Sequence, residues 1–317
     1  NTARATIQLE DQNQQIFLQV SSANLTDFLF NSGETILNYS LDGNFSNVDL
    51  IHWLGMDDLP YTLNGNLSVT GNGMYPKTAE IALKGELNNW VIQDKQLDKI
   101  TFDVSLNNGN LAGLVQGNGQ FGSFSLNPSV QNLFDMPVYK ANFTARNLDL
   151  ERLTGISDLS SDINLTASFN GKEFDPEKIS VAGQINMLNS RFQHIQIDTL
   201  LAKAAYRNQN LKLDNLRTKT RLALLTASGN YSFNAPSDFK LEAVFSGVDE
   251  FYAYLPDSSL QTSGTIQARL WGMPDALWLE TTSELDSTRY GDISLAKLSL
   301  IANGQLTPTD TLFDARL

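Results

Sequence analysis

The stretch Ile100-Thr101-Phe102-Asp103-Val104-Ser105-Leu106 alternates apolar and polar residues and runs into Asn107-Asn108-Gly109. Strict alternation places successive side chains on opposite faces of a β-strand, so that one face is apolar and the other polar. An Asn-Gly pair between two alternating runs is the strongest short signal for a hairpin. The stretch therefore predicts antiparallel strands joined by tight turns, with one dry and one wet face.

The same alternation recurs through most of the chain. It is seen around Leu63, Leu67 and Val69, in Ile163-Asn164-Leu165-Thr166-Ala167-Ser168-Phe169, and around Ile266 and Leu270. Such runs follow one another too closely for crossover helices, which excludes a βαβ architecture. Further tight turns are predicted at Asp42-Gly43, Asn170-Gly171, Asn208-Gln209 and Asn303-Gly304.

A short element returns about every hundred residues. Asn47-Val48-Asp49-Leu50 recurs as Asn147-Leu148-Asp149-Leu150 and, more loosely, as Gly247-Val248-Asp249-Glu250. A fixed period of this kind indicates a stacked, extendable β architecture. We expect residues 1–317 to form one continuous segment, divided into a partial repeat (1–47), two full repeats (48–147 and 148–247) and a truncated repeat (248–317).

Short helices are expected at the repeat boundaries. Asn47 and Asn147 are placed as N-caps, with Asp49 and Asp149 in the first turn, where a carboxylate favours the positive end of the helix. The expected helices have apolar faces (Leu50, Ile51, Trp53 and Leu54; Leu150 and Leu153) and end at Gly55, Gly155 and Pro256. Further helical turns are predicted at 24–28 and 127–134.

Composition excludes several classes of function. The 317 residues carry a net charge of −13, which disfavours nucleic acid because phosphate binding needs clustered cations. There is no cysteine, and therefore no disulfide or thiolate site. No apolar run approaches the roughly 20 residues that cross a bilayer. The chain starts at Asn1 rather than Met, and we expect it to be a segment of a longer protein with its anchor elsewhere.

The sequence offers no catalytic constellation. His52 and His194 are the only histidines, and no Gly-x-Ser-x-Gly elbow accompanies them. Asp57-Asp58 is best explained as a solvated loop. We therefore expect no enzyme activity, no cofactor and no metal. Four tryptophans are open to two interpretations, packing under the short helices or a carbohydrate platform, and packing is favoured; they are Trp53, Trp90, Trp271 and Trp278.

The order of these elements carries a resemblance. The run 63–71, then Pro76, then Leu83-Lys84-Gly85-Glu86-Leu87 resembles the periodic "LxGxLxLxG…P…LxGxL" texture of the AsmA/TamB superfamily. A second copy spans 163–171, Pro176 and 181–185, and a third begins at Ser263. The resemblance covers most of the chain and does not separate the AsmA branch from the TamB branch.

The resemblance implies a fold and a location. Members form an extended antiparallel sheet curled into an open, taco-like groove with an apolar interior, in the periplasm of diderm bacteria. They are implicated in carrying phospholipid to the outer membrane and in assembling outer-membrane proteins. Membership would make this chain a segment of a periplasm-spanning protein of the cell envelope, with partners in the outer or inner membrane bound by regions outside it.

Elementary physics points the same way. The apolar face of a sheet must be covered, either by closure of the sheet into a barrel, by a second sheet or by a bound molecule. Extendable repeats cannot close as one barrel, so we expect an open trough that holds acyl chains of phospholipid. The runner-up is a structural or chaperone scaffold for outer-membrane protein assembly that offers strand edges, and a third candidate is an extracellular β-solenoid adhesin. The residues expected to line the groove are Leu63, Leu67, Val69, Ile100, Phe102, Val104, Leu106, Ile163, Leu165, Phe169, Phe239, Leu241, Phe245, Ile266 and Leu270.

Overall fold

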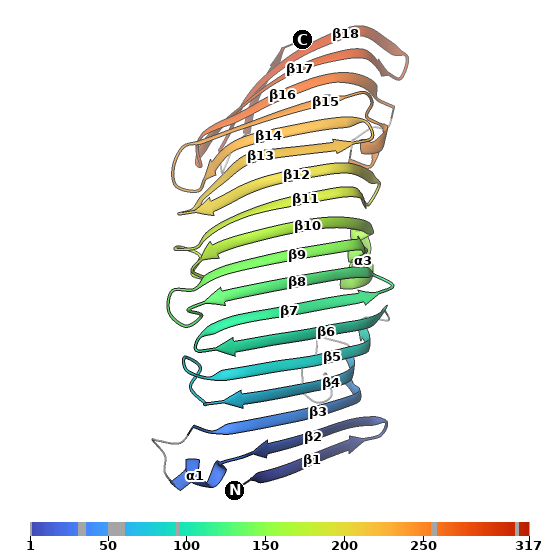
Figure 1. Cartoon of the computed structure of the whole chain (residues 1–317). Helices are drawn as coiled ribbons and strands as arrows, with labels where there is room; N and C mark the ends of the chain where they lie inside the picture. Colours follow the sequence, from blue (N-terminus) through green and yellow to red (C-terminus); the bar gives the residue numbers. More distant parts are fainter. Residues whose placement is uncertain are drawn as a thin grey trace. The chain divides into compact units, whose positions relative to one another are not determined.

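The computed structural model is mainly β, and it describes residues 2–30, 36–49, 61–92, 95–254, 259–307 and 311–316. The chain divides into two compact units, Asn1–Asp162 (unit 1) and Ile163–Leu317 (unit 2). In each unit the described strands form an antiparallel sheet that is not closed into a barrel. Figure 1 labels the elements along the chain.

The sheet of unit 1 is a meander, in which every strand pairs with the next one along the chain. Its described strands are β1 (Ala3–Asp11), β2 (Gln14–Ser22), β3 (Asn38–Asp49), β4 (Tyr61–Asn72), β5 (Glu80–Ile92), β6 (Lys95–Asn107), β7 (Asn110–Gly119), β8 (Gly122–Gln131) and β9 (Val138–Leu148). Sequential pairing requires only short loops, as the dense turn signals predicted.

Unit 2 repeats this arrangement from β11 to β19. Hydrogen bonds of Asn164 to Ser190 and Asn189 join β10 to β11. The described strands are β10 (Ser161–Lys172, whose first two residues belong to unit 1), β11 (Ser180–Phe192), β12 (Ile195–Arg207), β13 (Asn210–Thr220), β14 (Ala223–Ser232), β15 (Ser237–Phe245), β16 (Gln261–Met273), β17 (Ala276–Tyr290), β18 (Ile293–Leu306) and β19 (Thr311–Arg316).

The strand bounds recur along the chain. β4, β5 and β6 have counterparts 100 residues later in β10, β11 and β12, and β7 and β8 have counterparts in β13 and β14. Each hundred residues therefore holds six strands. The described strands reach 15 residues in β17.

The described helices are few and short. They are α1 (Leu25–Phe30), α3 (Leu150–Thr154), and the 3₁₀ turns η1 (Ser157–Leu159) and η2 (Asp249–Tyr254). Helical turns near residues 24–28 and at 150–154 are confirmed. The expected helix at Leu50, Ile51, Trp53 and Leu54, its stop at Gly55, and the stop at Pro256 all lie outside the described residues.

The start of α3 differs from the prediction. Asn147 has a positive φ of 49° and donates from Nδ2 to Asp162 Oδ1 at 3.1 Å, so it is not the N-cap. Asp149 is the cap, because its carboxylate accepts a hydrogen bond from the backbone N–H of Arg152 at 3.3 Å. The expected C-terminal stop is confirmed: Gly155 has φ 81° and donates its N–H to the carbonyl of Glu151.

Two of the predicted turns are confirmed and three are wrong. Asn108-Gly109 and Asn208-Gln209 form tight hairpins with left-handed φ at both positions. The other three pairs, Asp42-Gly43, Asn170-Gly171 and Asn303-Gly304, lie inside β3, β10 and β18. Gly43 faces the side chains of Leu18 and Phe45, and Gly304 is paired with Leu279. Glycine at position 43 makes room for neighbouring side chains rather than for a turn.

The helical turn predicted at 127–134 is also wrong, because most of it belongs to β8. Pro128 lies inside that strand and pairs with Ala141 of β9. The β7–β8 pairing is interrupted opposite Pro128, between Ala112↔Ser129 and Val115↔Leu126. Proline has no N–H to donate to a ladder, and the sheet accommodates it by leaving these positions unpaired.

Buried apolar side chains are scarce in the described chain. In unit 1 they include Phe121, Val48, Leu148 and Ala145, and in unit 2 Ile163 and Phe245. Phe121 and Leu148 lie near the ends of strands next to α3, and the backbone carbonyl of Phe121 accepts the N–H of Asp149. Buried side chains thus gather at strand ends, whereas most apolar side chains of the strand interiors are only half-buried.

Candidate functional site

In unit 1 the pairing of the strands places the apolar side chains on one face of the sheet, which we call the apolar face. Directly paired residues of an antiparallel sheet point to the same side, and alternate residues of a strand do so as well. One row of paired residues crosses the unit from β1 to β9: Ile7, Leu18, Gly43, Leu67, Gly85, Phe102, Val115, Leu126 and Phe143. The next row contains Ala5, Val20, Leu41, Val69, Leu83, Val104 and Gly113. Every member of both rows is apolar.

All seven groove residues predicted in this unit lie on that face. On β4 they are Leu63, Leu67 and Val69, and on β6 they are Ile100, Phe102, Val104 and Leu106. The two strands are separated by β5, whose Leu83 is paired with both Val69 and Val104. The pairing of β4 and β6 with β5 therefore places both groups of predicted residues on the same face.

Unit 2 has an apolar face of the same kind. One row contains Gly183, Ala204, Leu213, Gly229, Phe239, Leu270, Leu279 and Gly304. The ring of Phe169 lies against Gly183, which places β10 in register with this face. The predicted residues Ile163, Leu165 and Phe169 of β10, Phe239, Leu241 and Phe245 of β15, and Ile266 and Leu270 of β16 all point to it. At β17 the face becomes more polar, because Thr281 and Ser283 take its next positions.

No described element covers these faces within their units. The described strands pack on their chain neighbours, and α3 contacts only η1 and β6 among the described elements with more than marginal contact. The side chain of Arg152 on α3 donates to the carbonyl of Gln120, at the end of the sheet beyond β7. On the outermost strand Ile7 and Leu9 remain 44% and 40% exposed.

Sequence reasoning missed most of the apolar face. In unit 1 the contributions of β1, β2, β3, β5, β7, β8 and β9 were not predicted. Examples of the same alternation are Ala5-Thr6-Ile7-Gln8-Leu9 in β1 and Phe124-Ser125-Leu126 in β8. A search for period-two alternation alone, without the glycine texture, would have found them.

The opposite face, which we call the polar face, carries cross-strand ion pairs. Lys84 and Asp103 are 2.9 Å apart on β5 and β6, and Arg269 on β16 holds both carboxylate oxygens of Asp238 on β15 at 2.9 Å. The hydrogen bond from Lys99 lowers the pKa of Glu86, and the hydrogen bond from Arg269 lowers the pKa of Asp238. Both carboxylates are therefore ionised at neutral pH.

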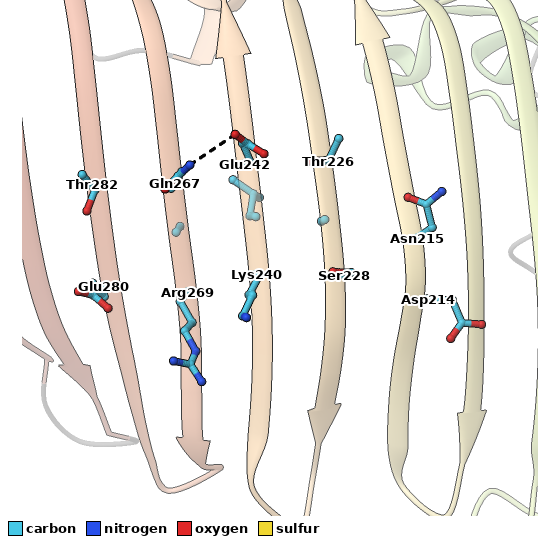
Figure 2. Close-up of a pocket in the computed structure, with 13 residues that line it drawn as sticks. Asp214, Asn215, Thr226, Ser228, Lys240, Glu242, Gln267, Arg269, Glu280 and Thr282 are labelled. Carbon is cyan, nitrogen blue, oxygen red and sulfur yellow. Dashed lines mark hydrogen bonds between the residues drawn. The ribbon is translucent and has the colours of Figure 1, made fainter.

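The polar face of unit 2 is hollowed by a depression of about 590 Å³. It spans β13 to β17, and Figure 2 shows the side chains that line it. Sequence analysis did not predict this hollow. The tryptophan prediction also needs correction here: Trp271 and Trp278 are not packed under helices but form a cross-strand pair on the polar face next to it. The side chain of Trp278 is 45% exposed.

The remaining candidates from the sequence lie in a turn or outside the described residues. His194 lies in the turn between β11 and β12, as expected, and His52 and Asp57-Asp58 lie outside the described residues. In the described ranges no three His, Cys, Asp or Glu side chains are placed to hold a metal ion. None of the described helices has the length and apolar character to cross a membrane. No protein-family model, curated protein or solved structure matches the chain.

Proposed function

We propose that the apolar face binds the acyl chains of phospholipid, and that the chain is a lipid-conducting segment of an AsmA/TamB-like protein. The observation that carries the proposal is the unbroken apolar row from Ile7 on β1 to Phe143 on β9, which no described element of its unit covers. A contiguous apolar surface of this extent is typical of a ligand-binding groove or an interaction site.

The energetics favour a hydrocarbon ligand. Each buried CH₂ group contributes about 0.8 kcal/mol, so a fourteen-carbon chain gains up to about 11 kcal/mol on full burial. The cost of ordering the chain and of association reduces this gain. Since the ligand is bound by burial rather than by directed hydrogen bonds, positions along a uniform apolar row are nearly equivalent. A lipid then moves along the row without crossing a high barrier.

In this proposal the two faces of the sheet have different roles. Acyl chains rest on the apolar face, while the headgroup remains in water at the open side. The polar face, with its ion pairs, keeps the other side of the sheet soluble. The conduit is passive, and components outside this segment set the direction of movement. The proposed location is the periplasm of a diderm bacterium, where phospholipid has to pass between two membranes.

Site-specific photo-crosslinking tests the proposal. A photoreactive phenylalanine analogue is placed at Val104, on the apolar face, and at its neighbour Ser105, on the polar face of the same strand. A second pair, Leu241 and Lys240 on β15, serves unit 2. The protein is incubated with radiolabelled phosphatidylethanolamine and irradiated. We expect lipid adducts at Val104 and Leu241 and none at Ser105 and Lys240.

The controls separate lipid binding from other uses of the sheet. Val104→Asp should reduce uptake of a fluorescent fatty acid and remove lipid crosslinking around that position, while Ser105→Asp, one residue away, should do neither. Equal lipid crosslinking at all four positions, or none at any, would contradict the proposal. Crosslinks to unfolded outer-membrane protein in place of lipid would favour the alternative, a scaffold for outer-membrane protein assembly.

A further inference from the structure

The hollow on the polar face of unit 2 arises from the lengths of its side chains. Thr226 and Ser228 on β14 are short, and longer side chains stand on both sides of them, Asp214 on β13 and Lys240 and Glu242 on β15. The floor is the backbone around Ala227, Leu241 and Ala268, whose own side chains point to the apolar face. A volume of about 590 Å³ lies within the range of about 300–1,000 Å³ that is typical of small-molecule sites.

A β-bulge shapes one wall of the hollow. The registers of β13 with β12 and with β14 both shift at Asp214-Asn215, so that these two consecutive residues stand opposite Lys203. Alternation would send them to opposite faces, yet both line the hollow. The corresponding strand of unit 1, β7, pairs with β6 without any shift. Bulges re-aim side chains and are over-represented next to functional sites.

The polar groups of the wall offer both donors and acceptors. Lys240, Arg269 and Gln267 donate, whereas the carboxylates of Asp214, Glu242 and Glu280 accept. Gln267 also donates to Glu242 at 3.4 Å, the dashed line in Figure 2. The wall holds two cations and three carboxylates, and Asp214 is also paired with Lys212 at 2.8 Å, so the wall has no excess of positive charge that would attract phosphate. A neutral ligand with many hydroxyl groups would use both kinds of group.

An aromatic platform borders the hollow. Trp271 and Trp278 are paired across β16 and β17 on the same face. The guanidinium of Arg269 lies 5.3 Å from the ring centre of Trp271 and is fixed from the other side by both oxygens of Asp238. Trp271 is thus already in contact with a cation, whereas Trp278, two residues from Glu280 of the wall, is 45% exposed. The electron-rich face of an indole attracts weakly positive C–H groups.

We propose that this hollow binds an uncharged oligosaccharide, with the C–H face of one pyranose ring on Trp278 and the hydroxyl groups of the next on the polar wall. Sugars present one apolar face and a rim of hydroxyl groups that both donate and accept, and the site offers these two surfaces side by side. Arg269 is held in place before the ligand arrives, which lowers the entropy lost on binding. The site lies on the face opposite the proposed acyl-binding face, so either proposal can fail alone.

Calorimetry and saturation-transfer NMR on the full 317-residue chain test the inference. The probes are chitotriose, cellotriose and maltotriose at millimolar concentration. At least one trisaccharide should bind saturably, and Trp278→Ala should weaken that binding at least about fivefold through loss of the stacking surface. Inorganic phosphate should not compete.

A matched pair of variants locates the site. Ser228 and Ser129 are both exposed serines of the polar face, and each is paired directly with a lysine, Lys240 and Lys140 respectively. Ser228→Phe fills the hollow and should abolish binding, whereas Ser129→Phe in unit 1 should leave it unchanged. Circular dichroism checks that each variant folds. If Trp278→Ala does not fold, the comparison of Ser228→Phe with Ser129→Phe tests the inference. The inference is overturned if none of the three sugars binds, if Ser228→Phe binds as the parent does, or if phosphate displaces the sugar.

Discussion

The ring of Phe124 on β8 lies directly over Gly117 on β7, its partner across the apolar face. A methyl group on Gly117 would overlap that ring, and the three nearest atoms it would meet all belong to Phe124. The same arrangement recurs where Phe102 lies over Gly85 and where Tyr39 lies over Gly71. Glycine leaves part of the strand backbone uncovered, and an aromatic neighbour restores the lost cover.

This pairing predicts that Gly117→Ala destabilises the protein. Displacing the ring costs about 1–3 kcal/mol, and the lower entropy of the unfolded chain recovers about 0.5–1 kcal/mol. A net loss of about 1–2 kcal/mol should appear as a lower urea midpoint. In a Phe124→Leu background the clash is gone, so the same Gly117→Ala change should be neutral or stabilising. Equal losses in both backgrounds would show that the ring is not the cause.

The hairpins at Asn108-Gly109 and Asn208-Gln209 predict a stabilising change. Gln209 has φ 58° where its counterpart Gly109 has φ 74°. A non-glycine residue in the left-handed region costs roughly 1–2 kcal/mol of folding free energy. Glycine removes this strain, but it loses more conformational entropy on folding, which costs about 0.5–1 kcal/mol. Gln209→Gly should therefore raise the urea midpoint by an amount equivalent to about 0.5–1 kcal/mol. Gln209→Ala keeps the strained φ and should give no gain.

The cap of α3 predicts a graded response at Asp149. Its carboxylate accepts from the N–H of Arg152 at 3.3 Å, and its Oδ2 lies 3.3 Å from Arg152 Nε. Asp149→Ala should cost about 1 kcal/mol of unfolding free energy, in the range of N-cap deletions. Asp149→Asn retains the cap acceptor without the charge and should cost much less. If Asn proved as costly as Ala in thermal unfolding, the ion pair rather than the cap would be the stabilising contact.

On the strands where it was applied, such as β4 and β6, alternation assigned the apolar side chains to one face correctly, because the period of a strand depends only on local geometry. Neighbouring strands such as β4 and β6 then share a face through their pairing with β5. The pair Asp42-Gly43 was misjudged for a physical reason. Asx-Gly permits a turn, but glycine is equally required where a partner strand presents a bulky side chain, and the sequence does not identify the partner.

The polar hollow was beyond local reasoning for a similar cause. Asp214 and Asn215 share a face only because β12 and β14 both shift register against β13 at that point. The tryptophan pair was misjudged because Trp271 and Trp278 are brought together by the β16–β17 hairpin rather than by a helix. Both features depend on which strand lies beside which, and alternation within one strand carries no such information.

The ion pair of Asp238 with Arg269 predicts a pH dependence of known sign. The hydrogen bond from Arg269 is the main cause that lowers the pKa of Asp238, and the charges of Arg269 and Lys240 add to it. A lowered folded-state pKa contributes stability that is complete above the unfolded-state value of about 4 and is lost as the pH falls through the folded-state value. The urea midpoints of the parent and Arg269→Gln should therefore differ by a constant amount from about pH 5 to 8, and the difference should shrink below about pH 4.

Carboxyl-detected NMR gives the direct measurement. In Arg269→Gln the pKa of Asp238 should rise toward the ordinary aspartate value, because its strongest hydrogen-bond donor is gone. Arg217→Gln removes a cation of the same polar face on β13, which does not contact Asp238, and should leave that pKa unchanged. A pKa of Asp238 that stays low without Arg269 would assign the effect to Lys240 instead, and the Lys240→Gln variant would then raise it.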